Sequence, residues 1–306
     1  MTHKAWTRIA VLALLWGSAF LWIKVALDHG LSPLQVTVAR SAFGALALVV
    51  LARMTGRRLP RDRATWGRLV VAAFFCNALP FLLFAVGVES TSSGMAGALN
   101  ATTPLWSLLV GMAIGTERGL RPVRLAGLLL GFAGTLLIFA PWQGSGPLTW
   151  GVLAMLGGAA SYAVAFAYMG RELVGRGAPV ALSAAQLLMA AGLSAPVLAV
   201  SGAVPAEADV TALVAVVILG VFCTGVTFYL NFRLIEDEGA TSAAVVGYLL
   251  PVVSVALGAL VLDEELTLRV IAGMAVVLLG VGLTRRTPPH PIHLAGSRGG
   301  TGSTAD

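Results

Sequence analysis

Apolar residues come in runs along this 306-residue chain, separated by short connections that carry most of its charge. Runs of roughly twenty residues are the length of a helix that crosses about 30 Å of hydrocarbon. Charged residues make up 11% of the chain, whereas a soluble domain needs about a quarter to cover its surface. The pattern therefore predicts an all-α integral membrane protein.

We expect ten transmembrane helices, at residues 8–27, 33–52, 67–87, 93–114, 122–140, 150–169, 178–199, 211–231, 241–262 and 267–284. A Pro/Gly-rich stretch divides the chain near its middle. The predicted organisation is a first five-helix unit, a periplasmic linker, a second five-helix unit and a disordered cytoplasmic tail, at residues 1–140, 141–149, 150–286 and 287–306.

The basic residues predict an orientation. If the N-terminus is cytoplasmic, 17 of the 20 Lys and Arg residues fall on the cytoplasmic side, and Arg269 alone lies in an outer loop. Cytoplasmic loops carry an excess of Lys and Arg. We therefore expect a multi-pass protein of a bacterial inner membrane with both termini in the cytoplasm, and we read the net charge of +6 as a topology signal, so no nucleic-acid partner is expected.

The second half of the chain repeats the first. A shift of 147 positions brings Cys76 onto Cys223 and Pro104 onto Pro251, together with several Phe, Gly and Glu residues. Because each half holds an odd number of predicted helices, the second half must enter the membrane from the opposite side. Inverted repeats of this kind are typical of secondary transporters, in which two halves rock about a site near the bilayer midplane.

Several motifs carry a family resemblance. The first predicted helix contains Trp16-Gly17-Ser18-Ala19-Phe20, and the second opens with Leu31-Ser32-Pro33 and reaches Arg40. The two halves end in similar patterns: Pro104, Glu117, Gly127, Gly131 and Gly134 in the first, and Pro251, Glu264, Gly273 and Gly280 in the second.

Over nearly its whole length the chain resembles the EamA family of the drug/metabolite transporter superfamily. The resemblance implies ten helices, both termini inside, a cavity lined by the first four helices of each half, and transport of small metabolites, often export of amino acids or related compounds. The second half is the weaker copy, because Gln186 stands where the first half has Arg40.

Two cations lie within predicted helices. Arg40 is about two turns, roughly 10 Å, from the outer end of its helix. It is either a fixed positive charge in the transport cavity or a structural residue that bonds helix-end carbonyls. Lys24 is nearer the membrane surface, where its long side chain can reach water, although both cations could attract an anion. No acidic residue lies deep in a predicted helix, which favours facilitated diffusion or exchange over proton coupling, with Glu89 and Asp28 at the outer rim as the alternative proton sites.

Neutral polar and aromatic side chains within the helices complete the candidate substrate site. Taken singly, each has an ordinary role in helix packing, but as a set they predict a cavity for small polar or amphipathic molecules. The cavity candidates beside Arg40 and Lys24 are Trp16, Asn77, Asn100, Trp106, Tyr162, Gln186, Thr224, Tyr229 and Tyr248. Pro104 and Pro251 are candidate hinges, with a static bend as the equal alternative.

The sequence lacks the patterns of other classes. It has no GxxxxGK[ST] loop and no HExxH motif, and its four His residues lie outside the predicted helices. We therefore expect no enzyme activity, cofactor or metal. The expected partners are a small-molecule substrate and the lipid bilayer, with the chain a monomer or homodimer. We predict a permease that exports an amino acid or related metabolite by alternating access. Nucleotide-sugars and hydrophobic drugs are the alternative cargoes, and an intramembrane enzyme is the alternative class.

Overall fold

The computed structural model describes residues 3–90, 93–115, 122–140, 149–201, 208–261 and 267–285. Within these ranges the regular structure is helical, and it makes ten helices in total when segments joined through π or 3₁₀ turns, and the two at 93–100 and 103–113, are each counted as one. Residues 141–148 of the predicted linker and the predicted tail 287–306 lie outside the described residues, as do Glu117 and Glu264.

The N-terminal half begins with α1 (His3–Asp28) and α2 (Pro33–Met54), followed by α3 (Arg63–Ala73), the π-helical segment η1 (Phe74–Ala78) and α4 (Leu79–Ser90). It ends with α5 (Ser93–Asn100), α6 (Thr103–Ala113) and α7 (Pro122–Phe139).

The C-terminal half begins with α8 (Trp150–Glu172) and α9 (Pro179–Val200), followed by α10 (Val210–Gly220), the π-helical segment η3 (Val221–Val226) and α11 (Thr227–Glu238). It ends with α12 (Ala240–Ala244), the 3₁₀ turn η4 (Val245–Tyr248), α13 (Leu249–Val261) and α14 (Leu268–Arg285).

Among the described residues, six helical stretches are long and apolar enough to cross a membrane. They are Thr7–Asp28, Pro33–Met54, Arg63–Ser90, Trp150–Glu172, Pro179–Val200 and Val210–Glu238. Three apolar helices are shorter, at Thr103–Ala113, Leu125–Ile138 and Leu268–Leu283. The predicted all-α membrane fold is thus confirmed, with part of the predicted spans shorter than a full crossing.

The helix expected at 93–114 is wrong as a single rod, because it is two helices, α5 and α6, that meet at Ala101-Thr102. Proline has no N–H, and its ring clashes with the carbonyl four residues before it, which for Pro104 is that of Asn100. The Thr103 hydroxyl donates to this carbonyl over 2.7 Å. Pro104 therefore opens α6, where a proline is tolerated, and does not bend the middle of a continuous helix.

Two further boundaries differ from the sequence prediction. The helix expected at 211–231 runs on to Glu238 and ends at Gly239, whose φ of 85° favours glycine. The helix expected at 241–262 contains the 3₁₀ turn η4 directly before α13, which holds Pro251 near its start. The missing N–H of this proline removes one bond of the ladder at the junction.

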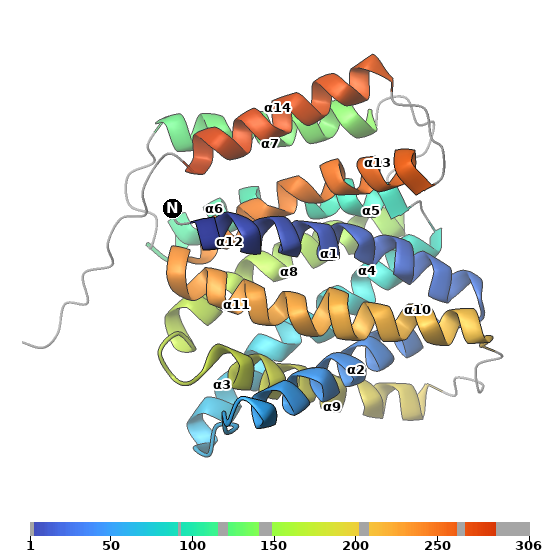
Figure 1. The fold of residues 1–306 in the computed structure, drawn as a ribbon, viewed down its shortest axis with the longest axis vertical. Coiled ribbons are helices and arrows are strands. Elements are labelled where there is room, and N and C mark those ends of the chain that lie inside the picture. The colour runs from blue at the N-terminus through green and yellow to red at the C-terminus, as the bar shows by residue number, and fades with distance from the viewer. Residues whose placement is uncertain are drawn as a thin grey trace, which may run out of the picture.

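Helices of the N-terminal half pack against helices of the C-terminal half. α1 contacts α10 and α13, α8 contacts α4 and α6, and α2 contacts α9. α7 and α14 lie side by side at one edge of the bundle, and α2 and α9 lie at the opposite edge (Figure 1). The centre of the molecule is therefore built from α1, α4, α8, α10 and the broken helices.

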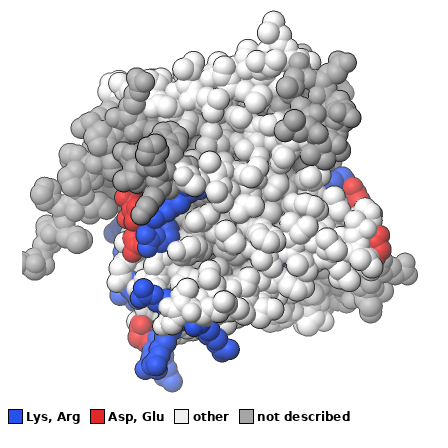
Figure 2. All heavy atoms as spheres, in the orientation of Figure 1, with Lys and Arg blue, Asp and Glu red and all other residues white. Residues whose placement is uncertain are grey.

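Charge gathers at one end of the bundle, where α2 ends, α3 begins, and α8 and α11 end (Figure 2). We call this the basic end. Two ion pairs join the halves here: Arg8 of α1 with Asp237 of α11, and Arg68 of α3 with Glu172 of α8, the latter at 3.0 Å. At the opposite end Lys24 pairs with Asp28 of its own helix at 3.1 Å. Among the described residues, the ion pairs between halves are thus at the basic end.

The contact between α7 and α14 depends on glycines. A Cβ on Gly134 would lie 2.7 Å from the backbone nitrogen of Val277, and one on Gly280 would lie 2.7 Å from the carbonyl oxygen of Gly127. Distances this short mean that the two backbones approach at the glycines, as in other membrane helix pairs with small interfacial residues.

We predict that Gly280→Val separates α7 from α14, because the added side chain meets backbone atoms that cannot move aside. The expected cost is about 1–3 kcal/mol of unfolding free energy. Thermal unfolding in detergent measures it. Gly282→Val is the matched control, because a Cβ on Gly282 meets nothing within 4 Å. Equal unfolding temperatures for the two variants would contradict the close contact.

Candidate functional site

A pocket lies in the centre of the bundle, between the two halves. It encloses about 540 Å³ of space, part of it open to solvent. The lining residues come from both halves: Trp16, Ala19, Phe20, Ile23, Arg40, Phe84, Asn100 and Thr103 from the N-terminal half, and Tyr162, Phe166, Ala244, Gly247 and Leu250 from the C-terminal half.

Aromatic rings form most of the pocket wall. Tyr162 stacks on Phe84 with ring centroids 5.9 Å apart, and Phe20 lies 5.6 Å from the same Phe84 ring. Trp16 stacks on Phe166 at 6.5 Å, with the ring planes 10° apart. The Phe84–Tyr162 and Trp16–Phe166 contacts cross from α4 and α1 to α8, so these rings hold the two halves together around the pocket.

Arg40 is the cation of this pocket. Its side chain is almost fully buried, with 4% of the residue exposed, and its guanidinium carbon lies 3.7 Å from the centre of the Phe81 ring. Its Nε–H donates to the hydroxyl of Thr224 over 3.1 Å. Within the described residues no carboxylate pairs with it. Arginine has five N–H donors, so the terminal nitrogens keep donors for another acceptor.

Local structure explains how these two groups meet. Ser32 caps α2 in a capping box with Gln35, and Pro33 follows at the first turn, which fixes where the helix begins and hence the position of Arg40. Thr224 lies in η3, where its hydroxyl also donates to the carbonyl of Leu219 over 2.8 Å. Wide turns of this kind inside helices occur often at functional sites.

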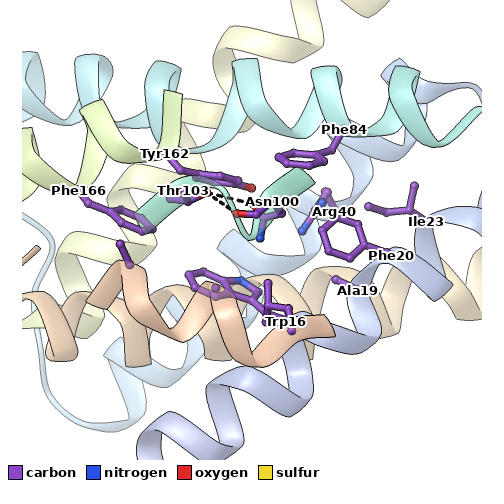
Figure 3. A pocket seen from close by; sticks show the side chains of 13 residues that line it. Trp16, Ala19, Phe20, Ile23, Arg40, Phe84, Asn100, Thr103, Tyr162 and Phe166 are labelled. Atoms are coloured by element: carbon purple, nitrogen blue, oxygen red, sulfur yellow. Dashed lines mark hydrogen bonds between the residues drawn. The ribbon is translucent and has the colours of Figure 1, made fainter. Parts of the chain in front are cut away.

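Asn100 provides the neutral polar group of the pocket. It is the last residue of α5, and its side-chain oxygen lies 3.5 Å from the Thr103 hydroxyl. Figure 3 shows Asn100 beside the Arg40 guanidinium, with Tyr162 and Trp16 on opposite sides of it. The break between α5 and α6 thus brings an amide next to the buried cation.

The structure therefore brings together four of the predicted cavity residues: Trp16, Arg40, Asn100 and Tyr162 line the pocket. Thr224 lies behind Arg40 as its hydrogen-bond acceptor.

Asn77 and Gln186 form a separate buried pair outside the pocket. The Gln186 Nε2 donates to the Asn77 Oδ1 over 2.7 Å.

The other predicted cavity residues lie elsewhere. Tyr248 is fully buried among α7, α13 and α14, and its hydroxyl donates to the Leu128 carbonyl over 2.9 Å. Tyr229 packs against α2 and α9. Trp106 packs against the hydrophobic cluster that includes the lining residues Phe20 and Phe84 but does not itself line the pocket. Lys24 pairs with Asp28 at the rim of the bundle.

Sequence reasoning missed the apolar wall. Phe20 and Ile23 continue the face of α1 that begins at Trp16 and Ala19, with the i, i+3, i+4, i+7 spacing of one helix face. That spacing was visible in the sequence. Phe166 lies one turn after the predicted residue Tyr162 in α8 and could have been chosen in the same way, whereas no predicted cavity residue of α4 indicated Phe84.

The described residues hold no cluster of three His, Cys, Asp or Glu side chains that could bind a metal. The wall offers a guanidinium, an amide and hydroxyls inside an aromatic enclosure. Such a wall can bind and orient a small polar molecule.

Comparison with known proteins identifies the chain. The model of the EamA-like transporter family matches residues 6–140 and again residues 149–286. The chain belongs to the EamA-like transporter family. It is therefore a multi-pass membrane transporter, and its pocket lies in both family-matched regions.

Relatives span the length of the transporter. An uncharacterized transporter of Archaeoglobus fulgidus is 25% identical over 92% of this chain and 99% of its own. The uncharacterized transporter YvbV of Bacillus subtilis is 26% identical over 90% of this chain and 89% of its own. A solved crystal structure shares the fold, with a TM-score of 0.75 and 21% identity, covering 92% of this chain and 97% of that one.

We predict that Thr224→Val destabilises the transporter, because a buried guanidinium N–H loses its acceptor. The expected cost is about 1–3 kcal/mol. Thermal unfolding in detergent measures it, and Thr224→Ser, which keeps the hydroxyl, should remain close to wild type.

Thr135→Val is the matched control. Thr135 is equally buried, but its hydroxyl donates to the Gly131 carbonyl of its own helix. If both valine variants lose the same stability, Thr224 does not support Arg40.

Proposed function

We propose that this transporter moves a small organic metabolite carrying a carboxylate, by alternating access, outward across the membrane. An amino acid or a related compound is the proposed cargo. The observation that carries the proposal is Arg40, a buried cation with free donors that faces a pocket between the two halves.

The chemistry of Arg40 favours an anionic group. A charge inside a membrane protein is costly, so it is kept where it faces a partner or a cavity. The planar guanidinium presents paired donors that match a carboxylate. Thr224 uses Nε only, and Asn100 adds an amide beside the guanidinium.

The lining of the pocket favours a metabolite with an apolar part. Binding pockets for small molecules are mostly apolar with a few placed polar groups. This wall has that composition, with aromatic rings around a guanidinium and an amide. The rings of Trp16, Tyr162 and Phe166 would contact the apolar portion while Arg40 holds the carboxylate.

The arrangement of the helices supports two inverted repeats that rock against each other. α1 packs on α13 of the other half as α8 packs on α6, and each also contacts the third long helix of the other half, α10–η3–α11 for α1 and α3–η1–α4 for α8. The π-helical segments η1 and η3 begin at Phe74 and Val221, which the sequence repeat aligns. Pro104 and Pro251 lie at the two breaks and are the proposed hinge points.

The charge distribution supports the orientation. Arg53, Arg57, Arg58, Arg61, Arg63 and Arg68 gather at the basic end, around the junction of α2 and α3. We propose that the basic end faces the cytoplasm of a bacterial cell, with both termini on that side.

The lining also bears on energy coupling. Among the described residues that line the pocket there is no carboxylate. A buried Asp or Glu is the usual carrier of a coupling proton. The proposed mechanism is therefore exchange or facilitated diffusion.

Counterflow in proteoliposomes tests the function. The panel contains labelled amino acids, organic acids, nucleotide-sugars and cationic drugs, with and without a pH gradient. Arg40→Ala should lower transport of the carboxylate substrate about 10- to 100-fold, because one charged hydrogen-bonded contact is lost. Lys24→Ala, which removes a rim cation already paired with Asp28, should transport like wild type.

Other results would change the proposal in stated ways. If only cationic drugs move, or Arg40→Ala transports as well as Lys24→Ala, Arg40 is structural and the carboxylate cargo is wrong. Stimulation by the pH gradient would contradict exchange or facilitated diffusion.

A further inference from the structure

We propose that Asn77 and Gln186 form a second substrate subsite, used when the transporter opens at its basic end. The inference rests on the proposed transport function. It assigns to this buried pair a ligand that offers a hydrogen-bond donor and an acceptor side by side, as the ammonium and carboxylate of a zwitterion do.

The pair is buried with unused hydrogen-bonding groups. Both residues are at most 1% exposed. The Gln186 Nε2 donates to the Asn77 Oδ1 over 2.7 Å, while the Asn77 Nδ2 and the Gln186 Oε1 have no partner. If both amides are turned over, the bond is kept and one donor and one acceptor again remain. Leaving such groups unpaired in an apolar interior costs stability, which points to a ligand in another state.

The pair corresponds to the Arg40–Thr224 pair of the pocket. Arg40 and Gln186 each lie seven residues beyond the proline that opens the helix, Pro33 in α2 and Pro179 in α9 (40 − 33 and 186 − 179). Each residue donates a hydrogen bond to a π-helical segment of the other half.

The two acceptors also match. Asn77 is the fourth residue of η1, and Thr224 is the fourth residue of η3. One pair faces the pocket, and the other is its counterpart in the second half, with an amide in place of the guanidinium.

The path to the pair is closed in this structure. Cys76 and Ala185, the chain neighbours of Asn77 and Gln186, belong to a buried hydrophobic cluster that continues to Leu173 and Ile235, near the ends of α8 and α11. The Arg8–Asp237 and Arg68–Glu172 ion pairs join the halves at this end. Separation of the halves here would give a ligand access to the amide pair, as the pocket gives access to Arg40.

The free atoms define the ligand chemistry. The Nδ2 group of Asn77 donates, and the Oε1 of Gln186 accepts. A zwitterion satisfies both, whereas a phosphate at neutral pH is mainly an acceptor and would leave Oε1 unpaired. An anion held only by charge would use Arg40 and not this pair. The subsite therefore favours amino-acid-like cargo over nucleotide-sugars.

The first test measures transport from each side of oriented proteoliposomes with labelled zwitterionic amino acids. The variant carries both Asn77→Leu and Gln186→Met, which keep the volume and remove both amides, so that neither is left without its partner. We expect KM at the basic end to rise about tenfold, KM at the opposite end to stay within about twofold, and the unfolding temperature not to fall. Unchanged KM at both ends would overturn the proposal.

The second test needs no substrate. In a Cys76→Ala/Cys223→Ala background, Gln186→Cys is exposed to a membrane-impermeant maleimide from either side. We expect labelling from the basic end. The rate should rise about fivefold in the Arg68→Glu variant, because the new carboxylate at position 68 then faces Glu172. Adding Glu172→Arg restores opposite charges and should slow labelling again. Lys24→Glu, at the opposite end, should not speed labelling from the basic end.

The two tests separate the possible failures. Absence of labelling from the basic end in every variant would overturn the subsite even if transport occurs. If the wild type moves nothing in the panel while labelling follows the expected pattern, the proposed cargo fails and the opening of this pair at the basic end is supported.

Discussion

The hydrogen-bonding needs of the backbone in an apolar surrounding are the constraint on which this structure depends. Helices meet that need within one segment, so each departure from a regular helix must be repaired locally. At the break between α5 and α6 the Thr103 hydroxyl donates a hydrogen bond to the carbonyl of Asn100, because Pro104 has no N–H to donate. In η3 the Thr224 hydroxyl donates a hydrogen bond to the carbonyl of Leu219. These repaired positions border the pocket, because irregular backbone places polar side chains where a regular helix would bury only apolar ones.

The aromatic enclosure and the buried guanidinium act together. Rings from α1, α4 and α8 exclude water from the pocket wall, and this exclusion strengthens the attraction between Arg40 and an anionic group. Phe81 covers one face of the guanidinium, and Thr224 holds its Nε. The cation is thus oriented before a ligand arrives, which lowers the ordering cost of binding.

Hydropathy predicted the all-α membrane fold, because the bilayer fixes the length of a helix that crosses it. The break at Thr102 was missed because apolar residues on both sides complete a run of about twenty, and Pro104 was interpreted as a hinge or bend within one helix. In the site, Arg40 and Asn100 were predictable as rare polar groups within helices. Tyr248 was predicted on the same grounds and instead bonds a carbonyl of α7, since composition does not reveal which neighbour a buried hydroxyl meets. The phenyl ring of Phe84 carried no signal among so many apolar residues.

The two ends of the bundle differ in how they are fastened. At the basic end the halves are joined by ion pairs whose side chains remain about a third exposed, whereas the rim pair of Lys24 and Asp28 lies within a single helix. Dissolved ions weaken the attraction between charges that water can reach. The ionic strength of the solution on that side therefore changes how strongly these ion pairs hold the two halves together. Salt on one side of the membrane thus weakens contacts between the two halves that salt on the other side does not reach.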